Sequence, residues 1–107
     1  MAFEPYHNIV GSTAQEVELV GIGDLRSSIK SVHLNNVHSS NAATISLYIY
    51  KPGSKPQELY FLLKDYSLSA KSFLVLDDAF VLNFNNRVYS LFIEVGSSDT
   101  VDVILGK

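Results

Sequence analysis

The chain of 107 residues contains no cysteine and no tryptophan, and only one methionine. The absence of cysteine excludes disulfide bonds and metal sites built on thiolates. Charged residues make up 18% of the chain, below the roughly 25% that is usual in globular domains. The net charge at pH 7 is -3. Because proteins that bind nucleic acids usually present a basic face, we expect no nucleic-acid partner.

Long apolar runs are also missing from the sequence. No stretch reaches the roughly 18 apolar residues that a membrane-spanning helix needs, so we expect no membrane segment. The first ten residues, MAFEPYHNIV, lack a cationic start followed by an apolar run, so we expect no cleaved secretory signal. Apolar residues account for 47% of the chain, which favours a folded domain with a core. We predict an N-terminal arm or first strand over residues 1–12 and a single domain over residues 13–107.

What the sequence does contain is a repeated alternation of apolar side chains. In TISLYIY (residues 44–50) aliphatic side chains occupy every second position, and Tyr48 and Tyr50 lie between them. Successive side chains of a strand point to opposite faces, so this pattern predicts a strand with an aliphatic core face. Seven further stretches follow the same logic, at residues 15–21, 28–36, 58–64, 72–78, 80–84, 88–95 and 100–106. In residues 72–78 both faces are apolar.

Turn-forming residues separate these stretches. KPGSKP (residues 51–56) favours a turn, and NNR (residues 85–87) suits a tight hairpin because Asn tolerates positive φ. Only GIGDLRSSIK (residues 21–30) contains a segment that could turn as a helix, after Asp24. About eight strands at this spacing predict an all-β fold: a single-domain antiparallel β-sandwich, either Ig-like or jelly-roll.

Few side chains are arranged for chemistry. His33 and His38 could contribute to a metal site, but the more ordinary interpretation is surface histidines. Asp77 and Asp78 could bind a cation, or they are turn residues. The serines occur without a GxSxG elbow, and no glycine-rich phosphate loop is present. We therefore predict a protein that is not an enzyme and that carries no metal and no cofactor.

The tyrosines are the most informative polar-aromatic residues. One interpretation is cross-strand packing on the surface of a sheet. The other is contact with a partner protein, because tyrosine is enriched at interfaces and apolar outer faces need a third layer or a partner. We predict four partner contacts, at Tyr48, Tyr50, Tyr60 and Tyr66.

The order of segments resembles a group of small β-sandwich virion structural proteins of tailed bacteriophages. The resemblance rests on YHNIVGSTAQEVELVGI, SSIKSVHLNNVHSSNAATISLYIYKPG, LYFLLKDYSLSAKSFLVLDD and VYSLFIEVGSSDTVDVILG, which together cover nearly the whole chain. It is a likeness of strands and turns, so it assigns no functional residue. It implies a non-enzymatic virion component, first of all a capsid decoration or cement protein that binds the major capsid lattice.

The resemblance also implies partners, and two alternative functions stay open. Such proteins commonly form homo-oligomers, often trimers, and contact other virion proteins. A tail, neck or baseplate protein is an alternative within the same particle. A carbohydrate-binding β-sandwich module is the alternative from another class, with Tyr48 and Tyr50 beside Asn35 and Asn36 as its aromatic platform. For the virion component, we expect the N-terminal stretch MAFEPYHN to be an arm over a neighbouring subunit, because Pro5 discourages regular structure there.

Overall fold

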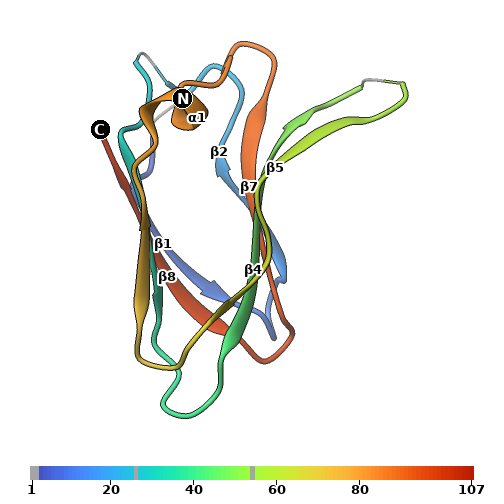
Figure 1. Ribbon diagram of the computed structural model, residues 1–107. Coiled ribbons are helices and arrows are strands. Elements are labelled where there is room, and N and C mark those ends of the chain that lie inside the picture. Colours follow the sequence, from blue (N-terminus) through green and yellow to red (C-terminus); the bar gives the residue numbers. More distant parts are fainter. Residues whose placement is uncertain (1–2, 26, 54) are drawn as a thin grey trace.

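Eight strands and one short helix make up the described part of the chain. The computed structural model describes residues 3–25, 27–53 and 55–107. The elements, in chain order, are β1 (Tyr6–Val10), β2 (Glu16–Val20), β3 (Ser31–Asn36), β4 (Ala43–Lys51), β5 (Glu58–Leu68), β6 (Phe73–Leu76), α1 (Ala79–Leu82), β7 (Ser90–Val95) and β8 (Thr100–Gly106). Two antiparallel four-stranded sheets pack face to face (Figure 1).

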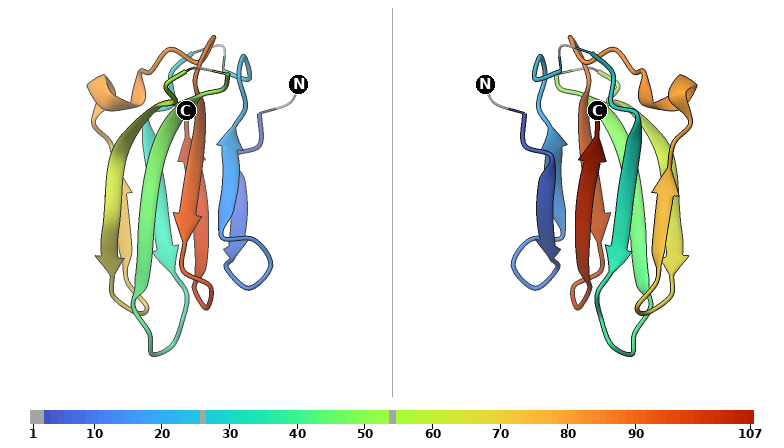
Figure 2. Two further views of the ribbon diagram at one scale, coloured as in Figure 1. Left: turned by 90° about the vertical axis from the view of Figure 1, so that its right-hand side faces the viewer. Right: turned by 90° about the vertical axis from the view of Figure 1, so that its left-hand side faces the viewer.

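The order of the strands identifies the arrangement as a jelly roll. One sheet, which we call sheet I, has the order β1-β8-β3-β6, and sheet II has the order β2-β7-β4-β5. The two sheets are seen face-on in turn in Figure 2. Thus β1 pairs with β8, β2 with β7, β3 with β6 and β4 with β5. This is the pairing of a long antiparallel ribbon that folds over to make two sheets. The predicted antiparallel β-sandwich is confirmed, and of its two forms the structure has the jelly roll.

The core is built from the alternating aliphatic side chains. In β4 the side chains of Ile45 and Leu47 are fully buried, and in β8 those of Val101, Val103 and Leu105 are buried opposite them in the sandwich. Each such side chain stabilises the fold by roughly 1.5–3 kcal/mol when it leaves water. The predicted core faces of these two strands are therefore confirmed.

The edge strand β5 departs from regular pairing. Its register against β4 shifts twice, between Ile45 and Leu47 and between Leu47 and Tyr48. Such bulges insert an extra residue and increase the local twist. As a result Leu62 and Leu63, which are adjacent in sequence, both pack against the core. The far end of the β4–β5 hairpin extends well beyond the other strands (Figure 1).

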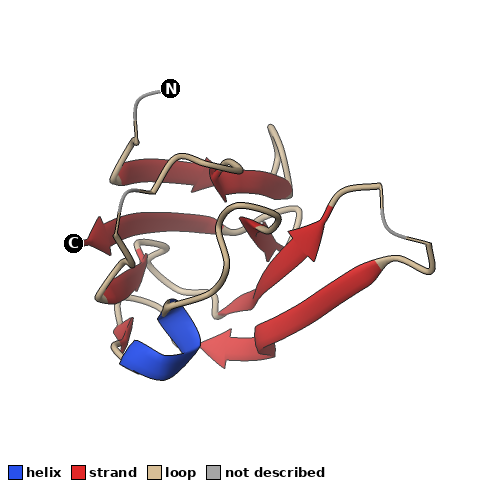
Figure 3. Ribbon diagram, turned by 90° about the horizontal axis from the view of Figure 1, so that it is seen from above, coloured by secondary structure: helices blue, strands red, loops and turns tan. Residues whose placement is uncertain are grey.

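The strand predicted for residues 80–84 is wrong. This stretch begins with the helix α1, because the carboxylate of Asp78 accepts hydrogen bonds from the backbone N–H groups of Phe80 and Val81, at 3.0 and 3.3 Å. An N-cap of this kind satisfies donors that the first helical turn leaves open. Leu82 is buried, whereas Phe80 is 91% exposed. The helix lies at the margin of the sandwich (Figure 3).

Two further local predictions, the hairpin at residues 85–87 and the helical turn within residues 21–30, are also not found. Residues 85–87 do not form a hairpin, because they connect α1 to β7 and have no strand before them. No helix occurs in the described part of residues 21–30, of which residue 26 lies outside the described chain.

At the N-terminus, the structure has the first strand rather than an arm over Tyr6–Val10, which pairs with β8. Residues 1–2 of the predicted arm lie outside the described residues.

The cap of α1 gives a stability prediction. Asp78→Ala removes both capping hydrogen bonds, so we expect the free energy of unfolding to fall by about 1 kcal/mol. Urea denaturation followed by circular dichroism measures the change. Asp77→Ala is the matched control, because Asp77 is an exposed neighbour that does not cap the helix. Equal midpoints for the two variants would contradict the capping role.

Candidate interaction surfaces

Tyr48 lies on the outer face of sheet II but is covered by its neighbours. Its ring stacks on Phe92, with centroids 5.6 Å apart and planes at 7°, and meets the edge of Phe61 at 5.6 Å. Both partners are directly opposite it on the adjacent strands. Its hydroxyl donates a hydrogen bond to Glu16. Only 5% of Tyr48 is exposed, so the ring stabilises the sheet and offers little surface to a partner.

Tyr50 lies two positions further along the same face and borders a hollow. Its ring meets Phe92 edge-on at 6.0 Å, and its hydroxyl accepts a hydrogen bond from Nε2 of Gln57 at 3.0 Å. The hollow has a volume of about 250 Å³. It is lined by one acidic, three aromatic, one amide and one aliphatic side chain: Glu16, Tyr48, Tyr50, Phe92, Gln57 and Leu59.

The other two predicted contacts lie on the opposite side of the sheet. Tyr60 is opposite Ile49 and Tyr66 is opposite Ile45, whose side chains point toward the core. Because β5 is an edge strand, Tyr60 and Tyr66 remain 54% and 39% exposed. The four predicted tyrosines therefore divide between the two faces of sheet II and do not form one patch. Their role as partner contacts stays a prediction.

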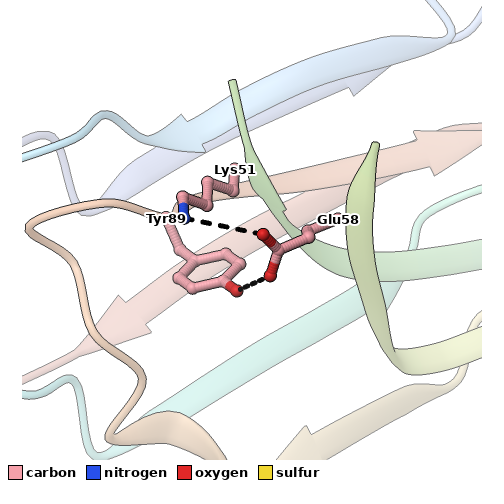
Figure 4. A network of polar contacts seen from close by, with 3 residues as sticks. All are labelled: Lys51, Glu58 and Tyr89. Carbon is pink, nitrogen blue, oxygen red and sulfur yellow. Dashed lines mark hydrogen bonds and ion pairs between the residues drawn. The ribbon is translucent and has the colours of Figure 1, made fainter. Parts of the chain in front are cut away.

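A small polar network supports the base of the protruding hairpin. The hydroxyl of Tyr89 donates a hydrogen bond to Oε1 of Glu58 at 2.9 Å, and Nζ of Lys51 lies 3.5 Å from Oε2 of the same carboxylate (Figure 4). Tyr60 packs against Tyr89, with ring centroids 6.0 Å apart. The hydrogen bond to Glu58 and partial desolvation raise the pKa of Tyr89 to about 12. Burial and the hydrogen bond to Glu16 likewise raise the pKa of Tyr48.

The outer face of sheet I is the surface that sequence reasoning missed. Since Val101, Val103 and Leu105 point inward, the alternate positions of β8 point outward. The registers then place four side chains in one row across the sheet: Tyr6, Ile104, His33 and Val75. Phe73 stacks on His33 from the adjacent position, with ring centroids 5.2 Å apart and planes at 9°.

This face combines exposed apolar side chains with uncharged polar ones and is nearly uncharged. Its most exposed side chains are Tyr6 at 67%, Phe73 at 63%, Ile104 at 45% and Val75 at 42%. Among the outward positions of its four strands, all of them described, Asp102 is the only Asp or Glu, and no Lys or Arg occurs. The Asp102 carboxylate accepts a hydrogen bond from Nδ2 of Asn8 at 2.7 Å. One signal was available in the sequence, namely that residues 72–78 are apolar on both faces.

The predicted metal-site candidates serve local structure. His33 takes part in the stack on sheet I, and Nδ1 of His38 accepts backbone hydrogen bonds from Ser40 and Asn41 at 3.1 and 3.2 Å. Asp78 caps α1. Within the described residues, no three His, Asp or Glu side chains gather in a way that would hold a metal ion.

The structure does not assemble the sugar-binding platform proposed from sequence. Tyr48 and Tyr50 belong to sheet II, whereas Asn35 and Asn36 belong to sheet I. Asn36 is fully buried, and its Nδ2 donates hydrogen bonds to the carbonyl groups of Asn41 and Leu68 at 2.9 and 3.0 Å. The two tyrosines and the two asparagines therefore cannot contact one ligand.

Comparisons with known proteins add no assignment. No family model, no curated protein and no solved structure matches the chain. Among the described residues, no helix has the length and apolar character needed to cross a membrane. The arguments about function therefore rest on the two outer faces of the sandwich.

The Tyr89 network predicts an alkaline titration. The hydrogen bond to Glu58 favours the protonated phenol, so its stabilisation is complete below pH 10, the ordinary pKa, and is lost as pH rises through about 12. We expect Tyr89→Phe to remove a late step from the phenolate absorbance curve. Glu58→Gln should keep the step but move it toward pH 10. A curve that neither substitution alters would contradict the assignment.

Proposed function

We propose that the chain is a non-enzymatic structural component of a tailed-phage virion, of the capsid decoration or cement type. The observation that carries the proposal is the group of exposed apolar side chains on the nearly uncharged outer face of sheet I. Jelly rolls are a recurrent architecture of viral capsid proteins, and they place such a face where a neighbouring subunit can cover it. The resemblance in the order of strands and turns supports the same class.

The size of the face fits an interface between subunits. A fully exposed aromatic side chain presents roughly 150–250 Å², so Tyr6 and Phe73, each about two-thirds exposed, add roughly 200–300 Å². With Ile104, Val75 and Val10, which are 39–45% exposed, the patch is as large as those that usually mark interaction sites on monomers. A standard interface hides roughly 800 Å² per partner, and the chain exposes 6299 Å² in all.

The occupant of this face is a second copy of the chain. A surface with one carboxylate and no Lys or Arg does not repel its own copy, because like-charge contacts across the interface are few. A homo-oligomer formed this way, a trimer included, would leave sheet II free for the capsid lattice. Weak contacts repeated over a lattice then add by avidity.

A tail, neck or baseplate protein is the alternative within the particle. The same apolar face would then contact a neighbouring subunit of a ring or tube. Immunogold labelling of virions from a phage that encodes this chain distinguishes a location on the head from one on the tail. We expect gold particles on the head shell. Gold confined to the tail favours the alternative, and particles without label would contradict a role in the virion.

The oligomer gives a direct mutational prediction. The exposed side chain of Ile104 lies in the centre of the face, so Ile104→Glu should leave the fold intact but place unpaired charges in the interface. We expect the unmodified chain to run as an oligomer in size-exclusion chromatography with light scattering, and Ile104→Glu to run at the monomer mass of 11.8 kDa.

Ser67→Glu is the matched control, since Ser67 is an exposed strand residue of sheet II. It should keep the oligomer. An unmodified chain that stays monomeric at all concentrations would contradict the role given to sheet I.

A further inference from the structure

We propose that the hollow on the outer face of sheet II binds an arginine side chain of a partner protein. The guanidinium would lie against Phe92 and bind the carboxylate of Glu16. This inference concerns a different face from the one that carries the proposed function, and it holds whichever protein supplies the arginine.

The size and the lining of the hollow both suit one long cationic side chain. Its volume of about 250 Å³ is below the roughly 300–1,000 Å³ of pockets that take drug-sized ligands, so it suits one long side chain. Phe92 and Leu59 supply apolar walls for a methylene stem, and Glu16 supplies one negative charge. No Lys or Arg is among the residues that line it.

The second argument is the unfavourable charge pattern beside the hollow. Glu16 is directly opposite Glu94 on the neighbouring strand. Directly opposed like charges destabilise a pair of strands. The ion pair found among the described residues joins Lys51 and Glu58, away from this pair. A cation bound at Glu16 would relieve the repulsion, which makes the site complementary to a positive ligand.

The third argument is that the binding groups are held in place. Tyr48 donates to Oε2 of Glu16 and is itself fixed between Phe61 and Phe92, so the carboxylate is oriented before any ligand arrives. Tyr48 uses one carboxylate oxygen, and no side chain among the described residues is found bonded to the other, Oε1, which leaves Oε1 for a ligand. The hydroxyl of Tyr50 accepts from Gln57, so its own proton is available to an acceptor on the partner's backbone.

Arginine fits these groups better than lysine or a sugar. Its planar guanidinium stacks on an aromatic ring and forms directional hydrogen bonds with a carboxylate, whereas an ammonium group is compact and strongly hydrated. A sugar would need a broad exposed aromatic face, and the ring of Tyr48 is almost fully covered.

The test is a titration of the isotope-labelled chain with acetyl-arginine amide, followed in ¹H–¹⁵N correlation spectra. Acetyl-citrulline amide is the matched probe, because it has the same shape without the charge. We expect saturable shifts of the backbone amides of Tyr50, Leu59 and Phe92 with the arginine probe only. Equal shifts with citrulline, or shifts that map elsewhere, would overturn the proposal, as would binding of methyl glucoside at these residues.

Two controls keep the result interpretable. Glu16→Gln keeps an acceptor for Tyr48 but removes the charge, and should weaken arginine binding by about tenfold. Asp77→Asn removes an exposed charge outside the hollow and should bind nearly as the unmodified chain does. If Glu16→Gln perturbs the fold, added salt gives a second reading, because screening should weaken the arginine shifts of the unmodified chain. Amide shifts that do not depend on the salt concentration would contradict an ionic contact between arginine and Glu16.

Discussion

The burial of one aliphatic row from each strand is the interaction on which the rest of the structure depends. Two sheets share a single apolar layer, with Ile45 and Leu47 from one sheet and Val101 and Val103 from the other at its centre. Because side chains alternate along a strand, this burial also determines which side chains point outward. The described part of the chain has too few elements to cover those outward faces, since the one helix found there lies at the margin of the sandwich.

The two outer faces differ in chemistry. Sheet I presents exposed aliphatic and aromatic side chains among uncharged polar ones, with one carboxylate, a composition that favours contact with a like surface. Sheet II presents an aromatic row that is packed within the chain and is bordered by Glu16 and Glu94. A small protein with two dissimilar faces can join two different neighbours, as a component that links subunits in a large particle must.

Sequence reasoning predicted the interior well because burial acts through a local pattern. The alternation in TISLYIY and TVDVILG was enough to assign the core-facing residues of β4 and β8. The same reasoning failed at residues 80–84, where Phe80, Leu82 and Phe84 also alternate. Asp78 accepts two capping hydrogen bonds there, and these favour a helical turn over the strand that the short apolar pattern predicts.

The candidate site was less predictable because it depends on pairing between distant segments. Alternation shows that Tyr48 points away from the core, but only the positions of Phe61 and Phe92 show that it is covered. Tyr6 and Ile104 lie near opposite ends of the chain and become neighbours only through the β1–β8 pair. The separation of Asn35 from Tyr48 into different sheets is equally invisible in a linear pattern.

Burial of the aliphatic rows therefore imposes the jelly-roll register. Nuclear Overhauser contacts between α-protons on opposed strands test it most directly. We expect cross-strand α-proton contacts that join β1 to β8 and β4 to β7, at the non-hydrogen-bonded pairs Tyr6–Ile104 and Leu47–Ile93. Contacts that join β1 to β2 in one sheet, or a β8 shifted by one residue so that Ile104 faces inward, would contradict it.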